Sequence, residues 1–459
     1  MAHQPPRTGI GRVISASLIG TTIEWYDFFL YGSAAALVFN KLFFPSSEPL
    51  VGTLLAFLTY AIGFAARPLG GMVFGHYGDK IGRKKLLVLS LLMMGGATFA
   101  MGLLPTHASI GVGAPILLTL LRLIQGFALG GEWGGAVLLV SEHGDDKNRG
   151  FWASWPQAGA PGGNLLATGV LALLAAIQSD EAFLAWGWRI PFLLSGLLVG
   201  IGLWIRVSVS ESPVFLEAQA KANEQAASGR KEKPPVAEVF RTHRRGVLTA
   251  IGVRLGENIS YYIITAFLLV YVTTHLGLSK SAGLNAVLIG SAVHFVTIPA
   301  WGALSDRIGR RPVTLIGSVG MTGWAFAFFA MLDTKSFPAI AAAVTVGLLF
   351  HGAMYGPQAA FISEMFDTRV RYSGASMGSQ LASIIGGALA PIIAVALLDD
   401  HGSSLPISIY LAVAVVITSL TVLLAKETRG RNLAQDHAPT EVTVPGSRPA
   451  PHDSIPAGG

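Results

Sequence analysis

Two acidic side chains stand in the first long apolar segment of the sequence, where charge is costly. Glu24 and Asp27 are three residues apart and Tyr31 follows one turn later, so a helix places all three on one face. An ionisable group at the centre of a bilayer costs about 2.5–3.5 kcal/mol on insertion scales, so it faces a wet cavity or a charged partner. We therefore predict proton coupling at Asp27 and Glu24, and also at Glu132 in the Gly-rich stretch 130–135. The alternative is a structural hydrogen-bond cluster between helices.

Arginines in later apolar segments suit an anionic ligand. A guanidinium stays charged and can donate two hydrogen bonds to one carboxylate, which makes Arg122 the predicted anion clamp. An internal ion pair with Asp27 or Glu132 is the alternative. Arg254 and Glu257 lie three residues apart, either as a self-neutralising pair or with Arg254 as a second positive pole that faces Arg122 across a cavity.

Polar side chains in the same segments are candidates for hydrogen bonds to substrate hydroxyl groups. Together with Arg122, Arg254 and Glu257, the predicted substrate site contains Tyr31, Gln157, Asn258, Tyr261, Tyr355, Gln358 and Gln380. Hydrogen bonding between helices is the alternative for each of them. His294 and His351 titrate near neutral pH as free side chains, but we leave them out because a single histidine in a membrane helix is more often a packing donor.

The elements that must position these residues are membrane helices. The chain has 459 residues, of which 52% are apolar and 13% charged, against about 25% charged in soluble proteins. Its mean hydropathy is +0.56, which excludes a soluble two-domain enzyme. Without cysteine it forms neither a disulfide nor a thiolate metal site, and it has no P-loop or H-E-x-x-H motif.

Twelve apolar runs predict an all-α integral membrane protein with twelve transmembrane helices. The predicted spans are 14–39, 51–75, 86–104, 114–141, 151–177, 188–207, 247–274, 282–304, 312–332, 337–362, 373–398 and 406–425. With the N-terminus inside, 25 of the 32 basic residues fall on the cytoplasmic side, and only Lys41, Arg189, Lys280 and Lys335 lie at the outer edge. This bias predicts that both termini are cytoplasmic. The formal charge of +6 then reflects positive-inside bias and attraction to anionic lipid, not nucleic-acid binding.

A charged loop motif occurs twice and divides the chain. Gly75-His-Tyr-Gly-Asp79-Lys80-Ile-Gly82-Arg83-Lys84 recurs as Gly302-Ala-Leu-Ser-Asp306-Arg307-Ile-Gly309-Arg310-Arg311, and Ser141-Glu142 with Arg149 recurs as Ser363-Glu364 with Arg371. We therefore predict two pseudo-symmetric six-helix bundles with a substrate site between them. The expected boundaries are a cytoplasmic N-terminus 1–13, bundles 14–207 and 246–425, a cytoplasmic linker 208–245 and a disordered cytoplasmic tail 426–459.

The repeated loop resembles the signature of the major facilitator superfamily. Glu24-Trp25-Tyr26-Asp27-Phe28, Arg67-Pro68-Leu69-Gly70-Gly71 and Gly187-Trp188-Arg189-Ile190-Pro191-Phe192 resemble its metabolite:proton symporter family. Ala36-Leu37-Val38-Phe39-Asn40 and Arg254-Leu255-Gly256-Glu257 are most similar to shikimate transporters. The resemblance implies a cytoplasmic gate of charged residues that closes the inside in the outward-open state. The gate residues are Asp79, Arg83, Glu142, Arg149, Asp306, Arg310, Glu364 and Arg371.

We accordingly expect an inner-membrane, proton-coupled symporter that imports a small polar organic acid, shikimate-like, by alternating access. It is expected to act as a monomer in lipid, without cofactors other than the coupling proton, and not as an enzyme. The alternatives are a symporter for 2-oxoglutarate, another dicarboxylate, proline or betaine, and an exporter that works by proton antiport.

Overall fold

The computed structural model describes residues 10–45, 49–81, 83–130, 146–208, 243–366 and 371–431. All regular structure in these ranges is helical, and each of the twelve predicted spans coincides with a helical segment. The fourth span is described only as far as residue 130, and most of the predicted linker lies outside the described residues, so the domain boundaries remain predictions.

The first half contains six long helical segments. They are α1 (Ile10–Ala34) with its π-helical continuation η1 (Ala35–Phe39), α3 (Pro49–Ile81), α4 (Arg83–Leu103), α6 (Gly113–Leu129), α8 (Arg149–Ile177) and α10 (Arg189–Ser208). Short elements between them are α2 (Asn40–Leu42), α5 (His107–Ile110), η2 (Asp146–Asn148), α9 (Asp180–Ala182) and η3 (Phe183–Gly187).

The second half repeats this plan with more interruptions. Its first span runs through α13 (Arg244–Tyr262), η4 (Ile263–Phe267), α14 (Leu268–Val270) and η5 (Tyr271–His275). The others are α15 (Lys280–Ile308), α16 (Arg310–Asp333), α17 (Phe337–Tyr355) with α18 (Gln358–Glu364), α19 (Arg371–Ala382) with η6 (Ser383–Ala388) and α20 (Leu389–His401), and α21 (Leu405–Leu424). Helices suit a lipid environment because they satisfy their backbone polar groups internally.

Among the described residues, eight helices are long and apolar enough to cross a membrane, and a bent pair formed by Asp180–Gly187 and Arg189–Trp204 makes a ninth. Side chains are distributed accordingly. Val112, Val296 and Leu424 are 72%, 68% and 88% exposed, whereas Asp27 and Arg122 are each 1% exposed. Apolar residues thus cover the outside and charges lie inside, as a bilayer requires.

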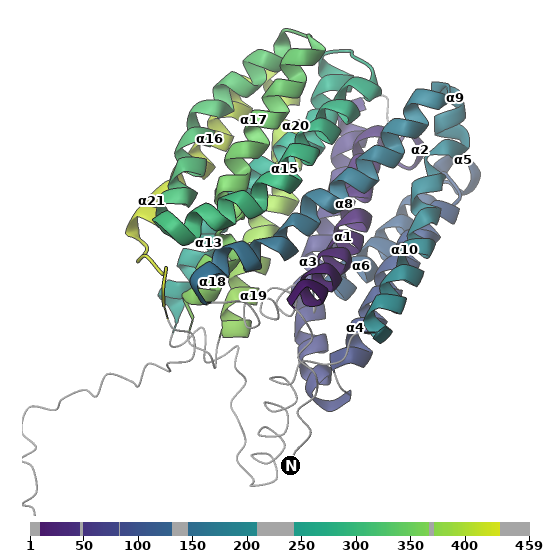
Figure 1. The fold of residues 1–459 in the computed structure, drawn as a ribbon. Helices are drawn as coiled ribbons and strands as arrows, with labels where there is room; N and C mark the ends of the chain where they lie inside the picture. Colours follow the sequence, from purple (N-terminus) through teal and green to yellow (C-terminus); the bar gives the residue numbers. More distant parts are fainter. Residues whose placement is uncertain are drawn as a thin grey trace, which may run out of the picture.

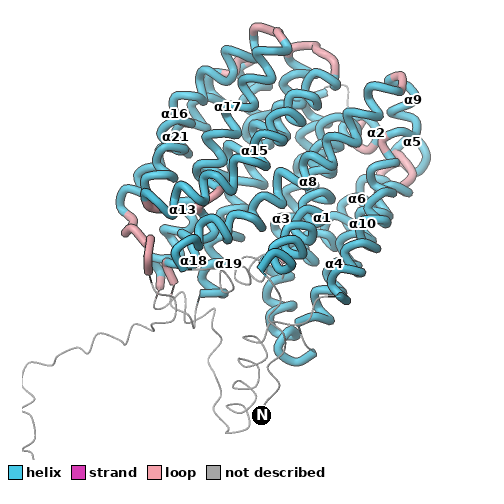
Figure 2. The backbone as a smooth tube through the Cα atoms, in the orientation of Figure 1, coloured by secondary structure: helices cyan, strands magenta, loops and turns pink. Residues whose placement is uncertain are grey.

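The two halves meet along α8 and α15. Figure 1 shows the helices of the first half, in purple to teal, beside those of the second half, in green to yellow, with α8 and α15 packed together between them. Helix α1 begins, and α21 ends, at the same face of the bundle, which we call the terminal face; the other is the opposite face. Figure 2 shows that short loops join the helices at the opposite face.

Candidate functional site

Asp27 lies deep in α1 with a carboxyl group that has no described partner. Neither carboxyl oxygen accepts a hydrogen bond from any residue that the structure describes, and no ion pair joins Asp27 to Arg122 among these residues. Glu24, one turn earlier in α1, is 7% exposed, and Glu132 lies outside the described residues. Burying an unpaired carboxylate costs far more than burying the neutral acid, so this environment suits a proton.

Two arginines of the first half enclose the ring of Phe28, which follows Asp27. The guanidinium carbon of Arg67 in α3 lies 4.5 Å from the ring centroid, and that of Arg122 in α6 lies 4.9 Å from it. Arg122 also lies 4.3 Å from the ring of Tyr31 and 4.6 Å from that of Tyr60. Aromatic faces attract cations, so these rings hold both guanidinium groups without neutralising them.

The two guanidinium groups retain unused donors. Nε and Nη2 of both Arg67 and Arg122 have no hydrogen-bond partner among the described residues, although Arg122 Nη1 donates to Gln125. A narrow space, too small to hold a water molecule, is lined by Phe28, Gly63, Arg67, Arg122, Gln125, Gly126 and Leu129. Buried donors that lack a partner are costly, so this region is suited to an anion.

The sequence analysis did not include Arg67 in the site. Its position in the middle of the second predicted span is the same signal that selected Arg122, because an intramembrane charge is seldom kept without a role.

In the second half, Glu257 is surrounded by hydrogen bonds. Its Oε2 accepts from Gln358 Nε2 and from Asn258 Nδ2, both at 3.1 Å, and its Oε1 lies 3.1 Å from His351 Nε2. Arg254, one turn earlier in α13, donates to Ser379 at 3.4 Å. The predicted residues Arg254, Glu257, Asn258 and Gln358 thus form one cluster of polar side chains.

The histidines left out above belong to this cluster. His351 Nδ1 lies 2.9 Å from His294 Nε2, and both rings are at most 1% exposed. Tyr261 and Tyr355 pack against His351 with tilted rings, whose centroids are 4.8 and 5.3 Å away. Single histidines in separate spans gave no sequence signal for this contact, because α15 and α17 are brought together only by the fold.

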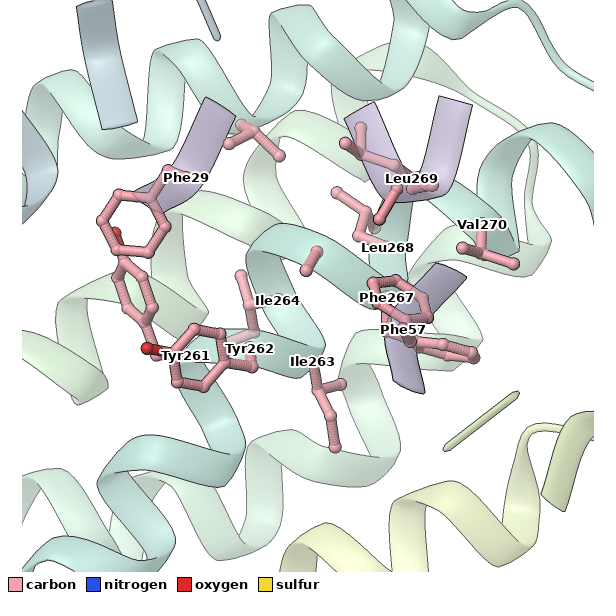
Figure 3. Packing of buried hydrophobic residues seen from close by; sticks show 14 of the residues in the cluster. Phe29, Phe57, Tyr261, Tyr262, Ile263, Ile264, Phe267, Leu268, Leu269 and Val270 are labelled. Carbon is pink, nitrogen blue, oxygen red and sulfur yellow. The ribbon is translucent and has the colours of Figure 1, made fainter. Parts of the chain in front are cut away.

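Aromatic residues connect the two clusters across the interface of the halves. Tyr262, at the end of α13, packs against Phe28 and Phe64, with ring centroids 6.1 and 5.8 Å away. Figure 3 shows Phe29 of α1 against Tyr261, and their ring centroids are 5.3 Å apart. Helix α13 becomes π-helical directly after Tyr262, as often happens at functional sites.

Three other predicted substrate residues have different surroundings. Tyr31 is buried and its hydroxyl shares a 2.6 Å hydrogen bond with Thr59. Gln157 is buried in α8, and its Nε2 has no partner among the described side chains. Gln380 is only partly buried, so it is the least enclosed of the set.

At the terminal face, charged residues join the halves. The carboxylate of Asp306 accepts the backbone N–H groups of Gly150 and Phe151, both at 2.8 Å, at the start of α8. Arg310 pairs with Asp306 at 2.7 Å and with Glu364 at 3.2 Å. A carboxylate is favoured at a helix N-terminus by the helix dipole and the free N–H groups.

Glu364 extends this network back to the first half. Its Oε1 pairs with Arg149 at 3.1 Å, and its Oε2 accepts from Thr428 at 2.6 Å. Four predicted gate residues, Arg149, Asp306, Arg310 and Glu364, are therefore in one network. Glu142 and the side chains of Asp79, Arg83 and Arg371 lie outside the described residues, so their roles remain predictions.

The segment after α21 returns to this network. Glu427 accepts the backbone N–H groups of Arg310 and Arg311 at 3.0 Å each and so caps α16. Partial burial raises the pKa of Glu427, but hydrogen bonds from the backbone N–H groups of Arg429, Arg310, Arg311 and Thr428 lower it, and the net pKa is below its usual value. Glu427 therefore stays ionised and holds the segment in place.

A contact at the opposite face also joins the halves. Lys280, at the start of α15, forms an ion pair with Asp180 of α9. The halves are thus in contact at both faces and, through the aromatic rings, at the centre.

Known transporters resemble this chain over most of its length. The sequence matches the family described as "Sugar (and other) transporter" over residues 13–438. It is 43% identical over 420 residues to the shikimate transporter of Escherichia coli (strain K12), covering 91% of this chain and 95% of that protein. It is 41% identical over 433 residues to the inner membrane metabolite transport protein YhjE of the same organism, covering 93% and 97%.

Among solved structures, the crystal structure of a D-xylose-proton symporter matches with a TM-score of 0.71 at 18% identity, covering 93% of this chain and 100% of that chain. At this identity the likeness shows the fold alone, and it confirms the predicted twelve-helix architecture. The chain therefore belongs to the sugar (and other) transporter family of the major facilitator superfamily and is a multi-pass membrane transporter, not an enzyme.

Proposed function

We propose that this transporter is a proton-coupled symporter of the inner membrane that imports a small polar organic acid resembling shikimate. The terminal face is cytoplasmic in this proposal, with both termini inside the cell, and the protein acts as a monomer with the proton as its coupling ion. The retention of most Lys and Arg residues on this side by the positive-inside rule supports the orientation.

One observation carries the proposal: a proton acceptor and an anion receptor lie together in the first half. Asp27 has a buried carboxyl group without a described partner, and Arg67 and Arg122 keep unused guanidinium donors around the adjacent ring of Phe28. A carboxylate of the substrate supplies acceptors to these donors, while a proton removes the charge of Asp27.

The nature of the substrate follows from the groups around this pair. Arg122 and Arg67 bind a carboxylate, and buried polar groups such as Gln157 and Tyr262 are placed to bind hydroxyl groups. The 43% identity to a shikimate transporter supports a cyclic hydroxy acid over an acyclic dicarboxylate or a zwitterion.

The transport cycle uses the network at the terminal face as the inner gate. Protonation of Asp27, with the proton shared by Glu24 or Glu132, accompanies entry of the anion from the opposite face. The pairs of Glu364 with Arg149 and of Asp306 with the start of α8 then break, and the substrate leaves to the cytoplasm. The two ligands drive this change only through their different affinities for the two states.

The test is uptake of labelled shikimate into proteoliposomes under an inward proton gradient, which is then collapsed with an uncoupler. 2-Oxoglutarate, citrate, proline and betaine serve as competitors. We expect accumulation that requires the gradient and is blocked by unlabelled shikimate. Uptake of a competitor in its place would reject the substrate and keep the symport mechanism, and efflux driven by the opposite gradient would indicate the exporter.

A further inference from the structure

We propose that Glu257, His351 and His294 form one shared proton-binding site in the second half, separate from Asp27. Its protonation releases the positive charge of Arg254 for the carboxylate of the substrate. The existence of the site is independent of the proposed function, whereas its effect on substrate binding rests on it.

The three side chains form an unbroken chain of hydrogen bonds across three helices. Glu257 Oε1 in α13 lies 3.1 Å from His351 Nε2 in α17, and His351 Nδ1 lies 2.9 Å from His294 Nε2 in α15. The other ring nitrogen of His294, Nδ1, has no hydrogen-bond partner in the described part of the chain, although the residue is fully buried. The chain therefore has a vacant acceptor at one end and a carboxylate at the other.

The directions of these bonds follow from the chemistry of the groups. When Glu257 is ionised, His351 donates its Nε2–H to the carboxylate, and a neutral His351 then accepts at Nδ1 from His294 Nε2–H. That leaves the lone pair of His294 Nδ1 free, which agrees with its lack of a partner.

One proton added at His294 Nδ1 can be passed along without breaking the chain. His294 gives its Nε2 proton to His351 Nδ1, and His351 gives its Nε2 proton to Glu257 Oε1. The cluster gains one proton and one positive charge, the carboxylate becomes a carboxylic acid, and each hydrogen bond reverses its direction. Because the groups are coupled, the proton belongs to the cluster and not to one residue.

The surroundings determine what this change of charge does. Among the described residues, the titratable or charged groups that interact with the cluster are Arg254, Tyr261 and Tyr262 of α13 and Tyr355 of α17. Helices α8, α15 and α18 contribute the neutral side chains of Asn164, Ser291 and Gln358. The cation of this set is Arg254, which lies one helical turn before Glu257 in α13. An ionised Glu257 offsets its charge, and a protonated Glu257 does not, so proton binding and anion binding favour each other.

The cluster also adjoins the interface between the halves. Asn164 of α8 donates to Tyr261 at 3.4 Å and to Ser291 at 3.1 Å, and Ser291 lies one turn before His294 in α15. Tyr261 packs against both histidine rings in a tilted arrangement, with centroids 4.8 and 5.9 Å away. A change in the charge of the cluster is thus made next to the contacts that separate when the halves move.

The test is a pH titration of full-length protein in lipid with 15N-labelled histidine, followed by magnetic resonance and without any substrate. The signals of His294 and His351 are assigned with His294→Gln and His351→Gln, since the chain has 11 histidines. We expect both signals to titrate with one common midpoint, and Glu257→Gln to move that midpoint by at least about one pH unit. Asp27→Asn should leave the midpoint unchanged, and His401→Gln, which removes an exposed histidine, is the matched control.

Signals that do not titrate, or that titrate with a midpoint unaffected by Glu257→Gln, would overturn the proposal. If His351→Gln fails to fold, the Glu257→Gln arm alone decides the outcome. A second measurement uses shikimate binding to purified protein. We expect the affinity of the wild type to weaken as the pH rises, and that of Glu257→Gln to vary less with pH, with the remaining dependence due to Asp27. A wild type that takes up the proton but does not bind shikimate would remove the substrate proposal and leave the site intact.

Discussion

The two halves hold their buried acids in opposite ways. Asp27 in the first half has no hydrogen-bond partner for either carboxyl oxygen among the described residues, whereas Glu257 in the second half has three partners. The buried arginines of the two halves also differ in their surroundings. Arg122 is held by aromatic rings, whereas Arg254 lies one turn from an acid on its own helix.

This difference assigns different tasks to two superficially equivalent acids. A bare buried carboxylate is tolerated only when it is protonated or meets a cation, so the closed bundle requires a change of charge at Asp27. A carboxyl group with a full set of hydrogen bonds is tolerated both ionised and protonated. Glu257 therefore changes the electrostatic potential in the site without controlling closure of the bundle. The pseudo-symmetry of the backbone thus does not extend to the chemistry.

The largest expected effect that would test this contrast comes from Asp27→Asn. With one coupled proton, each unit of pH gradient supports about tenfold accumulation of substrate. Asp27→Asn should lose this accumulation, while exchange of substrate across the membrane persists. Steady-state accumulation and counterflow in proteoliposomes measure the two activities. Glu257→Gln is the partner variant and should retain accumulation. The contrast fails if Asp27→Asn keeps full gradient-driven accumulation and only slows exchange equally at every pH.

The second prediction concerns the network at the terminal face, which keeps the bundle around the two acids closed. The variant Glu364→Gln should open this face. Removing this buried anion leaves Arg149 and Arg310 without their shared partner, at a cost of about 3–5 kcal/mol to the closed state. Spin labels at Asn148→Cys and Leu424→Cys, in a chain without native cysteine, should report a wider separation of the halves. Asp399→Asn, an exposed acid in α20, is the control and should change nothing. An unchanged separation would show that the network is not the gate.

Substrate affinity should distinguish the two arginines. Arg122→Gln removes a cation that forms no ion pair with an acid among the described residues, and we expect binding to weaken by about 2–5 kcal/mol, or roughly 30-fold and more. Arg254→Gln should cost less, roughly tenfold or below, since Glu257 already offsets part of its charge. Calorimetry with shikimate at fixed pH measures both. Equal losses of affinity in the two variants would contradict a difference between Arg122 and Arg254.

The smallest effect lies outside the membrane, at Glu427, where the acid is hydrogen-bonded as Glu257 is. Its pKa is lowered in the folded state by backbone N–H groups, so its stabilising contribution is present above its unfolded pKa of about 4.3. That contribution disappears as the pH falls through the lower folded pKa. Glu427→Gln should therefore lower the thermal midpoint slightly at neutral pH. The two curves should converge as the pH falls below the lowered pKa of Glu427 in the folded state, and a constant difference at every pH would be the contrary result.

The fold was largely predictable because its signals are local and long. Runs of about 20 apolar residues and the repeated Gly75 and Gly302 motifs predict twelve helices and two halves without any tertiary information. The positions at which Ile263–Phe267 and Ser383–Ala388 adopt π-helix were not predictable, because such segments depend on packing between helices.

The candidate site was predictable only where one residue is anomalous by itself. Asp27, Arg122, Arg254 and Glu257 are charges within apolar runs, and the structure places each of them inside the bundle. Pairings between helices, such as His294 with His351, leave no mark on the sequence. Their formation depends on the relative rotation of α15 and α17, which composition does not fix.

The segment from Glu427 to Arg431 has a consequence for the order in which the protein is made. Thr428 donates to Glu364, Arg149 donates to the carbonyl of Arg431, and Glu427 caps α16, yet this segment follows every helix that the structure describes. Because the chain is made from its N-terminus, these residues are added after every described helix of both halves. The complete network at the terminal face therefore forms only after the helical part of the chain has been translated, and a nascent transporter cannot close this face in the way the finished protein does.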